Sequence, residues 1–498
     1  MAEKKKVGFA SSIGFILAAA GSAVGLGNLW GFPYKTAKGG GAAFVIVYIA
    51  CVIFLGAICM ITEMHIGKRV HANPVTAYKD IHKGLGWIGV LAVFIPFFIT
   101  CYYSVLGGWT VKYAANSFAG NADIVSTFSV DGSQVFICTT VFVLLALVII
   151  GMGVEGGIEK MSKVLMPALF IILIGIVIYS LTLGEGVSEG LAFYLKPDFS
   201  QLTWDNVLLA MGQAFWSLSL GMGIMITYGS YTDKNIDLVK STGMICLFDT
   251  LVALLAGLAI FPAVAHFDPE LLDGSKGLAL IYIILPQVFE SMGTVGSIVS
   301  FLFFAMVVIA ALTSVISLLE VCTQFVIQKF HIKRTTAITA VAILVLLISI
   351  PVGDSLGHAG ILEDGTWTLF GLDWLTFFDE VTNTVLMPLC ALAACIVVGW
   401  VLKPKKAIEE MEGEGTKVPG WAKAIYPIFV KYVTPVGIAV IEFFGIKGEI
   451  DGGNIAVIIA SVILMALAIV VYFIFFVNGY TGTNADEKIA VETAPSEE

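Results

Sequence analysis

Polar side chains that could bind an ion lie inside long apolar stretches of this sequence. A carboxylate near the middle of a bilayer costs about 2.5–3.5 kcal/mol on insertion scales, so an ionisable residue there indicates a functional site. No Lys or Arg lies at the depth of Asp249 in nearby stretches, which leaves a metal ion or a proton as its partner. Oxygen ligands favour a hard cation such as sodium. The candidate ligands are Asp249 and Asn28, with the hydroxyls of Ser22, Ser217, Ser219, Thr313 and Ser314.

Each of these groups also has a purely structural interpretation. Asp249 could be protonated and bonded to the backbone. The adjacent hydroxyls of Thr313 and Ser314 could bond to carbonyls one turn earlier, as Ser and Thr commonly do in helices. Glu63 could satisfy amide N–H groups of a broken helix, or simply mark the membrane interface. These alternatives stay open at the level of the sequence.

Glycines interrupt two of the apolar stretches. The first stretch contains GSAVGLGNLWGFP at 21–33, and a later one contains SLSLGMG at 217–223. Glycine lowers helix stability by about 1 kcal/mol relative to alanine, and broken backbone at membrane depth survives only where protein or a cavity surrounds it. One such motif could be a close-packing face. Two at matching positions in two halves point to the binding site of a transporter.

The apolar stretches that position these residues are long enough to cross a membrane. The chain has 498 residues, of which 58% are hydrophobic and 13% charged, with a mean hydropathy of +0.94. We therefore predict an all-α polytopic membrane protein. Its twelve expected spans are 11–36, 42–66, 88–117, 134–151, 161–183, 205–231, 240–265, 293–328, 335–351, 376–402, 424–446 and 454–477.

The interrupted stretches are spans 1 and 6, each the first of a five-span unit. Five is odd, so the second unit is expected to insert upside down, as an inverted 5+5 repeat with two extra C-terminal helices. The expected organisation is a cytoplasmic N-terminus (1–10), the first repeat (11–203), the second repeat (204–402), helices 11 and 12 (403–477) and a disordered cytoplasmic tail (478–498).

Charge and cysteine usage narrow the class further. Most of the 27 Lys and Arg fall on one side of the expected spans, and the loops at 119–133 and 352–374 have none. Basic residues favour the cytoplasmic side, so both termini are expected inside, in a multi-pass protein of the cell membrane. All eight cysteines lie within spans, so no disulfide framework is indicated.

The net charge of −10 gives no indication that the protein binds nucleic acid. No nucleophile–base pair or metal motif indicates an enzyme.

Four motifs carry a family resemblance. They are GSAVGLGNLWGFPY at 21–34, KGGGAAF at 38–44, AFWSLSLGMG at 214–223 with TYGSY at 227–231, and AALTS at 310–314. With them the chain resembles the neurotransmitter:sodium symporter family, and in particular its prokaryotic amino-acid transporters with the fold of the bacterial leucine transporter. The resemblance runs from about Val7 to Trp400, and more weakly to the end.

The resemblance implies two sodium sites and an amino-acid pocket. Sodium site 1 would use the Ala23 carbonyl, Asn28, Ser217 and Asp249, with the substrate's carboxylate. Sodium site 2 would use the carbonyls of Gly21, Val24 and Ala310 and the hydroxyls of Thr313 and Ser314. The pocket would comprise Ser22, Ala23, Leu26, Gly27, Ile99, Tyr103, Trp216, Ser217, Ser219, Met222, Ser314 and Leu318.

The gates implied by the resemblance depart from the family pattern. Tyr103 and Trp216 would form the lid, with Gln213 nearby. The basic residue that usually pairs with an Asp in span 10 is replaced by Gly31, although the partner Asp379 is present. On the inside, the usual Arg–Asp pair aligns with Lys6 and Gln328, whereas Tyr231 and Ser230 of that gate are retained.

These features together predict sodium-coupled symport of a neutral, hydrophobic or aromatic amino acid by alternating access. The fixed carboxylate of Asp249 would replace the chloride that relatives with a neutral residue need. The expected partners are a free amino acid, two sodium ions and the lipid bilayer, with no nucleic acid, and a monomer would suffice for transport. The alternatives are a proton-coupled amino-acid transporter or exchanger of the same fold, which would use Asp249 or Glu63, and a non-transporting amino-acid sensor.

Overall fold

A computed structural model describes residues 8–120, 124–267, 280–355 and 368–477. Within this part of the chain, ten helical segments are long and apolar enough to cross a membrane. Several contain a π-helical turn (η). They are α3, η2 and α4 (Ala42–Lys68), α6 (Gly86–Asn116), α8 (Gly132–Gly151), η3 and α9 (Val154–Leu181), α13 (Leu238–Phe267), α15 (Gly293–Phe330), α16 (Arg334–Ser355), α17 to η9 (Trp374–Leu402), α20 to α21 (Gly420–Asp451), and α22 with η11 (Ile455–Val477).

The remaining two predicted spans are the broken ones. In span 1, α1 (Ser12–Ala23) and the segment of η1 and α2 (Gly27–Lys38) meet at an angle of 52°. In span 6, α11 (Trp204–Ser217) and α12 (Ile224–Ser230) are separated by six irregular residues. The predicted all-helical fold is therefore confirmed, and both interruptions fall where the glycines predicted them.

Positive backbone φ angles produce the break in span 6. Ser219 has φ 54°, Gly221 has φ 76° and Gly223 has φ 70°. A Cβ at Gly221 would lie 2.1 Å from the Met387 carbonyl oxygen, and one at Gly223 would lie 2.6 Å from that of Ala92. Only glycine combines this left-handed conformation with such a close approach of backbone to backbone.

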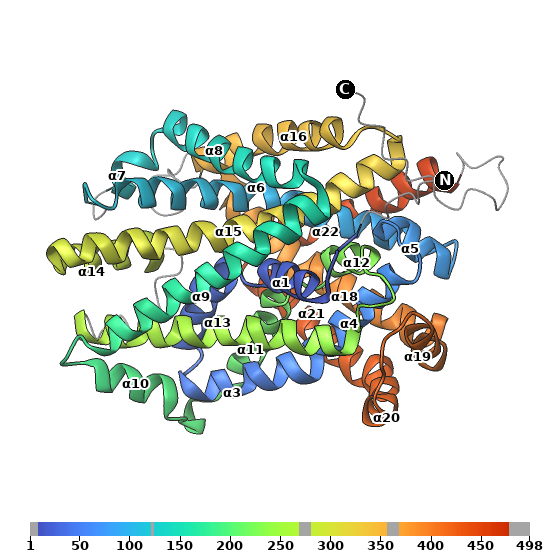
Figure 1. Cartoon of the computed structure of the whole chain (residues 1–498), viewed down its shortest axis with the longest axis horizontal. Helices are drawn as coiled ribbons and strands as arrows, with labels where there is room; N and C mark the ends of the chain where they lie inside the picture. The colour runs from blue at the N-terminus through green and yellow to red at the C-terminus, as the bar shows by residue number, and fades with distance from the viewer. Residues whose placement is uncertain (1–7, 121–123, 268–279, 356–367, 478–498) are drawn as a thin grey trace.

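Short elements connect the spans at the two ends of the bundle (Figure 1). One end carries α7 (Ile124–Phe128), α10 (Val187–Leu195) and α14 (Leu285–Ser291). The other carries α5 (Pro74–Ile81) and α19 (Pro404–Gly413), beside α20 (Gly420–Ile428), the start of the span Gly420–Asp451. Two short strands, β1 (Thr368–Leu369) and β2 (Leu372–Asp373), pair antiparallel before α17.

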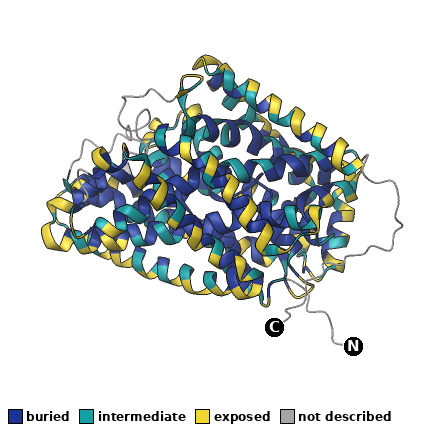
Figure 2. Ribbon diagram, turned by 90° about the horizontal axis from the view of Figure 1, so that it is seen from above, coloured by how far each residue is buried: buried dark blue, intermediate teal, exposed yellow. Residues whose placement is uncertain are grey.

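The interior surrounds the two breaks. The long helices α6 and α15 pack along one another, and α1 packs against α9, α13 and α15. Figure 2 shows buried residues filling this centre and exposed residues following the outer helices. Many of those exposed residues are large and apolar, such as Leu144 on α8, Ile171 on α9 and Ile463 on α22. Such outward apolar faces suit contact with lipid.

Candidate functional site

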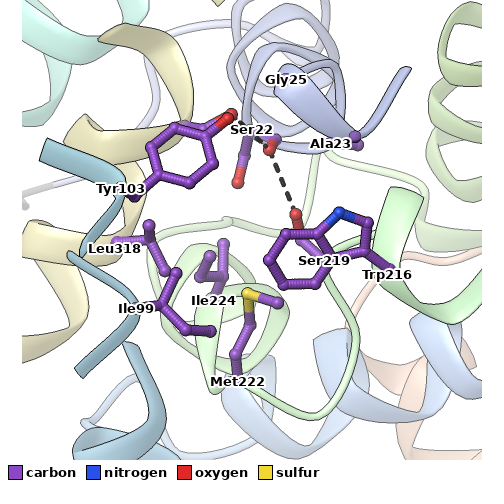
Figure 3. A pocket seen from close by; sticks show the side chains of 12 residues that line it. Ser22, Ala23, Gly25, Ile99, Tyr103, Trp216, Ser219, Met222, Ile224 and Leu318 are labelled. Atoms are coloured by element: carbon purple, nitrogen blue, oxygen red, sulfur yellow. Dashed lines mark hydrogen bonds between the residues drawn. The ribbon is translucent and has the colours of Figure 1, made fainter. Parts of the chain in front are cut away.

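A cavity lies between the two helix breaks (Figure 3). About 340 Å³ of space free of protein atoms lies between its walls, part of it open to solvent. Figure 3 shows a polar region formed by the Tyr103 hydroxyl, Ser22 and Ser219, and an apolar region formed by Ile99, Ile224, Met222 and Leu318. The wall is made of Ser22, Ala23, Gly25, Gly27, Ile99, Tyr103, Trp216, Ser219, Met222, Ile224, Ser314 and Leu318.

Most residues of the expected pocket line this cavity, and two do not. Among the described residues, the wall does not include Leu26 or Ser217. The Leu26 N–H donates to the Tyr103 hydroxyl at 2.8 Å. The Ser217 hydroxyl contacts the Asp249 carboxylate instead. Two wall residues, Gly25 and Ile224, were missed. A Cβ at Gly25 would lie 2.7 Å from the Tyr103 hydroxyl, so its closeness to the cavity depends on a tertiary contact that spacing does not reveal.

A buried polar cluster adjoins the cavity at the residues expected for sodium site 1. The Asn28 Nδ2 donates to Asp249 Oδ1 at 2.8 Å and to the Ser217 hydroxyl at 3.1 Å. The Ser217 Oγ lies 2.9 Å and 2.8 Å from the two Asp249 carboxylate oxygens. Asn28 and Asp249 are fully buried. The structure thus brings these three side chains from spans 1, 6 and 7 into one cluster.

Tyr48 belongs to the same cluster, although the sequence did not predict it there. Its hydroxyl lies 3.2 Å from Asp249 Oδ2 and 3.2 Å from the Ser217 hydroxyl. The side chain is fully buried and its ring packs on that of Phe32, with centroids 4.9 Å apart. A tyrosine within an apolar span usually indicates core packing. The one available signal was that a buried phenol needs a hydrogen-bond partner.

Of the two hydroxyls expected at sodium site 2, both on α15, that of Ser314 also contacts α1. Thr313 Oγ1 donates to the Ala310 carbonyl at 3.0 Å, and Ser314 Oγ lies 3.2 Å from that same oxygen. Ser314 Oγ is also 3.2 Å from the carbonyl of Ser22 on α1. The bonding to the preceding turn is therefore present for both hydroxyls, and that of Ser314 is shared with α1. A Cβ at Gly21 would lie only 3.4 Å from the Thr313 Cβ.

Glu63 supports the break in span 6. Its Oε1 accepts the Gly221 N–H at 2.8 Å, and the residue is 1% exposed. Of the two interpretations left open, satisfying an amide freed by a broken helix is the one that the geometry bears out. The carboxylate lies inside the protein, against backbone that an unbroken helix would have satisfied internally.

The residues of the expected outer gate lie beside the lid of the cavity. A Cβ at Gly27 would lie 2.7 Å from Trp216 Nε1, so the indole rests directly on this glycine. Gln213 Nε2 donates to the Gly27 carbonyl at 2.9 Å. Asp379 accepts hydrogen bonds from the Tyr102 hydroxyl, at 2.8 Å, and from the side-chain amide of Asn383. Lys35, one helical turn beyond Gly31, interacts electrostatically with Asp379.

At the inner gate, where Lys6 and Gln328 replace the usual Arg–Asp pair, the structure shows an ion pair that the sequence did not predict. Tyr231 donates to Glu320 Oε1 at 2.6 Å, and Arg334 holds the same carboxylate with both terminal nitrogens. Gln328 instead accepts the Asn73 N–H at 2.9 Å. Lys6 lies outside the described residues.

Comparisons with known proteins agree with this architecture. The model of the sodium:neurotransmitter symporter family matches residues 6–126 and 123–450. An uncharacterized sodium-dependent transporter of Bacillus subtilis, YhdH, is 36% identical over 430 residues, covering 82% of this chain and 91% of the relative. One from Haemophilus influenzae is 34% identical, covering 88% and 98%. The crystal structure of MhsT in complex with L-phenylalanine is 34% identical with a TM-score of 0.79, covering 88% of this chain and 99% of that one.

Proposed function

Because the chain belongs to the sodium:neurotransmitter symporter family, a family of transporters, we propose that it takes up a neutral amino acid by sodium-coupled symport. The observation that carries this proposal is the position of the cavity. It lies between the breaks of spans 1 and 6, with the cluster of Asn28, Ser217 and Asp249 beside it. A solute site and a cation site that share these breaks couple the binding of the two.

The polar region of the cavity suits the charged backbone groups of an amino acid. The segment Gly27–Lys38 begins at the cavity wall, and a half-helix N-terminus favours a carboxylate through its free N–H groups and dipole. Tyr103 and Ser22 bring hydroxyl groups to the same region. We infer that the substrate carboxylate faces Gly25 and Gly27 and completes sodium site 1.

The apolar region of the cavity favours a hydrophobic or aromatic side chain. Ile99, Ile224, Met222 and Leu318 offer no charged partner there, so side-chain selection would depend on the removal of apolar surface from water. Met222 is flexible and adapts to bulky groups. The related MhsT has been crystallised with L-phenylalanine, and we extend a substrate of this class to the present chain.

Two sodium ions are proposed, one at each expected site. At site 1 the Asn28 Nδ2 faces the carboxylate, and its Oδ1 accepts the Gly25 N–H at 3.1 Å. Turning this amide would present an oxygen to a cation. The Asp249 carboxylate supplies the fixed negative charge, so we propose that transport needs no chloride. Each sodium ion that enters down a 100 mV potential contributes about 2.3 kcal/mol to uphill transport.

The broken spans are proposed as the elements that alternate access. The half-helices α1 and α12 would move on one side of the membrane, and α2 and α11 on the other, with both termini cytoplasmic. The end of the bundle that carries α5 and α19 (Figure 1) would then face the cytoplasm, as the basic residues in the connections between spans predict.

The first experiment measures the thermal stability of the purified protein with each proteinogenic amino acid, in sodium and in potassium. A ligand that binds only the folded state raises the apparent Tm. We expect stabilisation by hydrophobic or aromatic amino acids in sodium alone. Equal stabilisation in both salts would favour the proton-coupled alternative, in which Asp249 carries the proton. No response to any amino acid would contradict an amino-acid substrate.

A further inference from the structure

Glu159 forms a buried contact at the start of α1, far along that helix from the break. It is the last residue of the η3 turn (Val154–Glu159), directly before α9, and it is 1% exposed. Its Oε2 accepts the Ala10 N–H at 2.6 Å, and its Oε1 accepts the Ser11 hydroxyl at 2.7 Å. Lys163 Nζ lies 2.7 Å from Oε1. One side chain on span 5 therefore holds two successive residues at the entry to span 1.

The first turn of α1 is shaped around this carboxylate. Ser11 caps the helix, because its hydroxyl accepts the Gly14 N–H at 3.1 Å. A Cβ at Gly14 would lie 2.1 Å from Glu159 Oε1 and 2.3 Å from its Cδ, so the contact requires glycine at this position. A carboxylate at a helix N-terminus also interacts favourably with the helix dipole.

The helices that Glu159 joins continue in contact up to the proposed sodium site 2. α9 packs along α1, and a Cβ at Gly21 would lie 3.3 Å from the Met166 sulfur on α9. Gly21 is an expected carbonyl ligand of that site. Holding the start of α1 against the start of α9 therefore also fixes the contact between Gly21 and Met166 beside the proposed sodium site.

We propose that Glu159 is a positioning residue for transport, which keeps α1 against α9 in the closed state and whose release lets the two helices part. This inference rests on the proposed function for its role in transport. The contact itself depends only on the packing of α1, η3 and α9.

A cysteine reporter tests the proposal. Ser162, three residues beyond Glu159, is 5% exposed, and Ser162→Cys is nearly isosteric. It lies three residues after Glu159 and four before Met166, so all three share the helix face that contacts α1, and its labelling rate with a small membrane-permeant maleimide would report how often α1 and α9 separate. The same protein without the reporter gives the background of the native cysteines. Glu159→Gln removes the charge and one acceptor, whereas Gly14→Ala drives the carboxylate away by steric clash, although alanine favours the helix.

We expect both variants to raise the labelling rate in sodium about tenfold, which corresponds to about 1.4 kcal/mol. Gly175→Ala is the matched control, since a Cβ at Gly175 on α9 meets nothing within 4 Å, and it should leave the rate unchanged. In a Glu159→Ala background, Gly14→Ala should add little, because the clashing group is gone. Apparent sodium affinity should fall in Glu159→Gln and Gly14→Ala more than the maximal rate does.

Unchanged labelling in folded Gly14→Ala, or a full additive effect of Gly14→Ala in the Glu159→Ala background, would overturn the proposal. If Glu159→Gln fails to fold, Gly14→Ala still decides the outcome. The labelling assay needs no transport. A wild-type protein with no sodium response, but with faster labelling in the variants, would contradict the proposed symport and leave the Glu159 contact standing.

Discussion

Ser217 Oγ lies within hydrogen-bond distance of both carboxylate oxygens of Asp249, at 2.9 Å and 2.8 Å. One hydroxyl carries one proton, so it can donate to only one of them at a time. Asn28 and Tyr48 supply further donors, and all of these groups are neutral. The buried carboxylate therefore has hydrogen bonds without a compensating charge from these neighbours, which is the condition under which a cation or a proton binds.

Asp249→Asn tests whether the cluster binds a sodium ion through the charge of this carboxylate. The amide keeps the shape and removes the negative charge, so we expect the apparent sodium affinity to fall at least about tenfold, equivalent to about 1.4 kcal/mol. Sodium titrations of thermal stability, in chloride and in gluconate, measure this. The wild type should respond equally in both anions, and chloride should partly restore the variant. A wild type that requires chloride would contradict the proposed role of Asp249.

Gly27→Ala should disturb the lid of the cavity. The new Cβ would lie 2.7 Å from Trp216 Nε1, so the indole must shift and substrate affinity should fall about tenfold or more. Substrate titration of Tm or of uptake gives the affinity. Gly31→Ala is the matched control, because its Cβ would meet only the Gln213 amide, Oε1 at 3.5 Å and Nε2 at 3.9 Å, which are ordinary contacts. Trp216→Phe in the Gly27→Ala background should recover binding. Equal losses in both glycine variants would contradict this account of the lid.

The helix breaks could be predicted from the sequence, because a glycine run at membrane depth has few structural solutions. Asn28, Ser217 and Asp249 were predictable as a set for a related reason: each is costly in an apolar span unless it meets another polar group. Their distances could not be predicted, since they depend on how three distant spans pack.

Other contacts were hidden because their residues look ordinary in sequence. Tyr48 is one aromatic among many in the spans, and only the fold shows its hydroxyl beside Asp249. Arg334 stands at the end of a span, where a basic residue indicates orientation, yet it binds the buried Glu320. Glu159 likewise follows a glycine-rich turn, and its partners Ala10 and Ser11 lie about 150 residues away.

Glu410 on α19 should make stability depend on pH. Arg69 Nε lies 3.0 Å and His65 Nε2 lies 3.2 Å from Glu410 Oε2. Burial raises the pKa of Glu410, but the hydrogen bonds and charges of His65 and Arg69 outweigh it and lower the pKa to about 2. Because the folded-state pKa lies below the ordinary value of 4.5, this contribution is complete above about pH 4.5 and is lost as the pH falls toward 2.

Thermal unfolding of Glu410→Gln across pH checks this dependence. The variant should have a lower Tm than the wild type at pH 7, and the difference should shrink progressively below about pH 4.5. Glu409→Gln is the matched control, since Glu409 is an exposed neighbour on the same helix. A Tm difference that grows as the pH falls would show that the sign of the linkage is wrong.

Substitutions at Glu320 and Arg334 should lower the free energy of unfolding by unequal amounts. The Glu320 side chain is fully buried, whereas that of Arg334 is 22% exposed. Arg334→Gln therefore strands a buried carboxylate, at a cost of about 3–5 kcal/mol. Glu320→Gln leaves a cation that still reaches water and donates to the Ile150 carbonyl at 2.9 Å, so it should cost less. Tyr231→Phe removes one hydrogen bond to a charged group, worth about 1.5–3 kcal/mol.

The double variant separates the charge effect from packing. With Glu320→Gln already present, Arg334→Gln strands no charge, so the pair should be close in stability to Glu320→Gln alone and above Arg334→Gln. Thermal unfolding of the four proteins gives the interaction energy as a double-mutant cycle. Additive losses, with no recovery in the double variant, would mean that Glu320 is held by other groups. The hydrogen bond from Tyr231 to Glu320 and the ion pair of Glu320 with Arg334 would then not hold this end of the bundle closed.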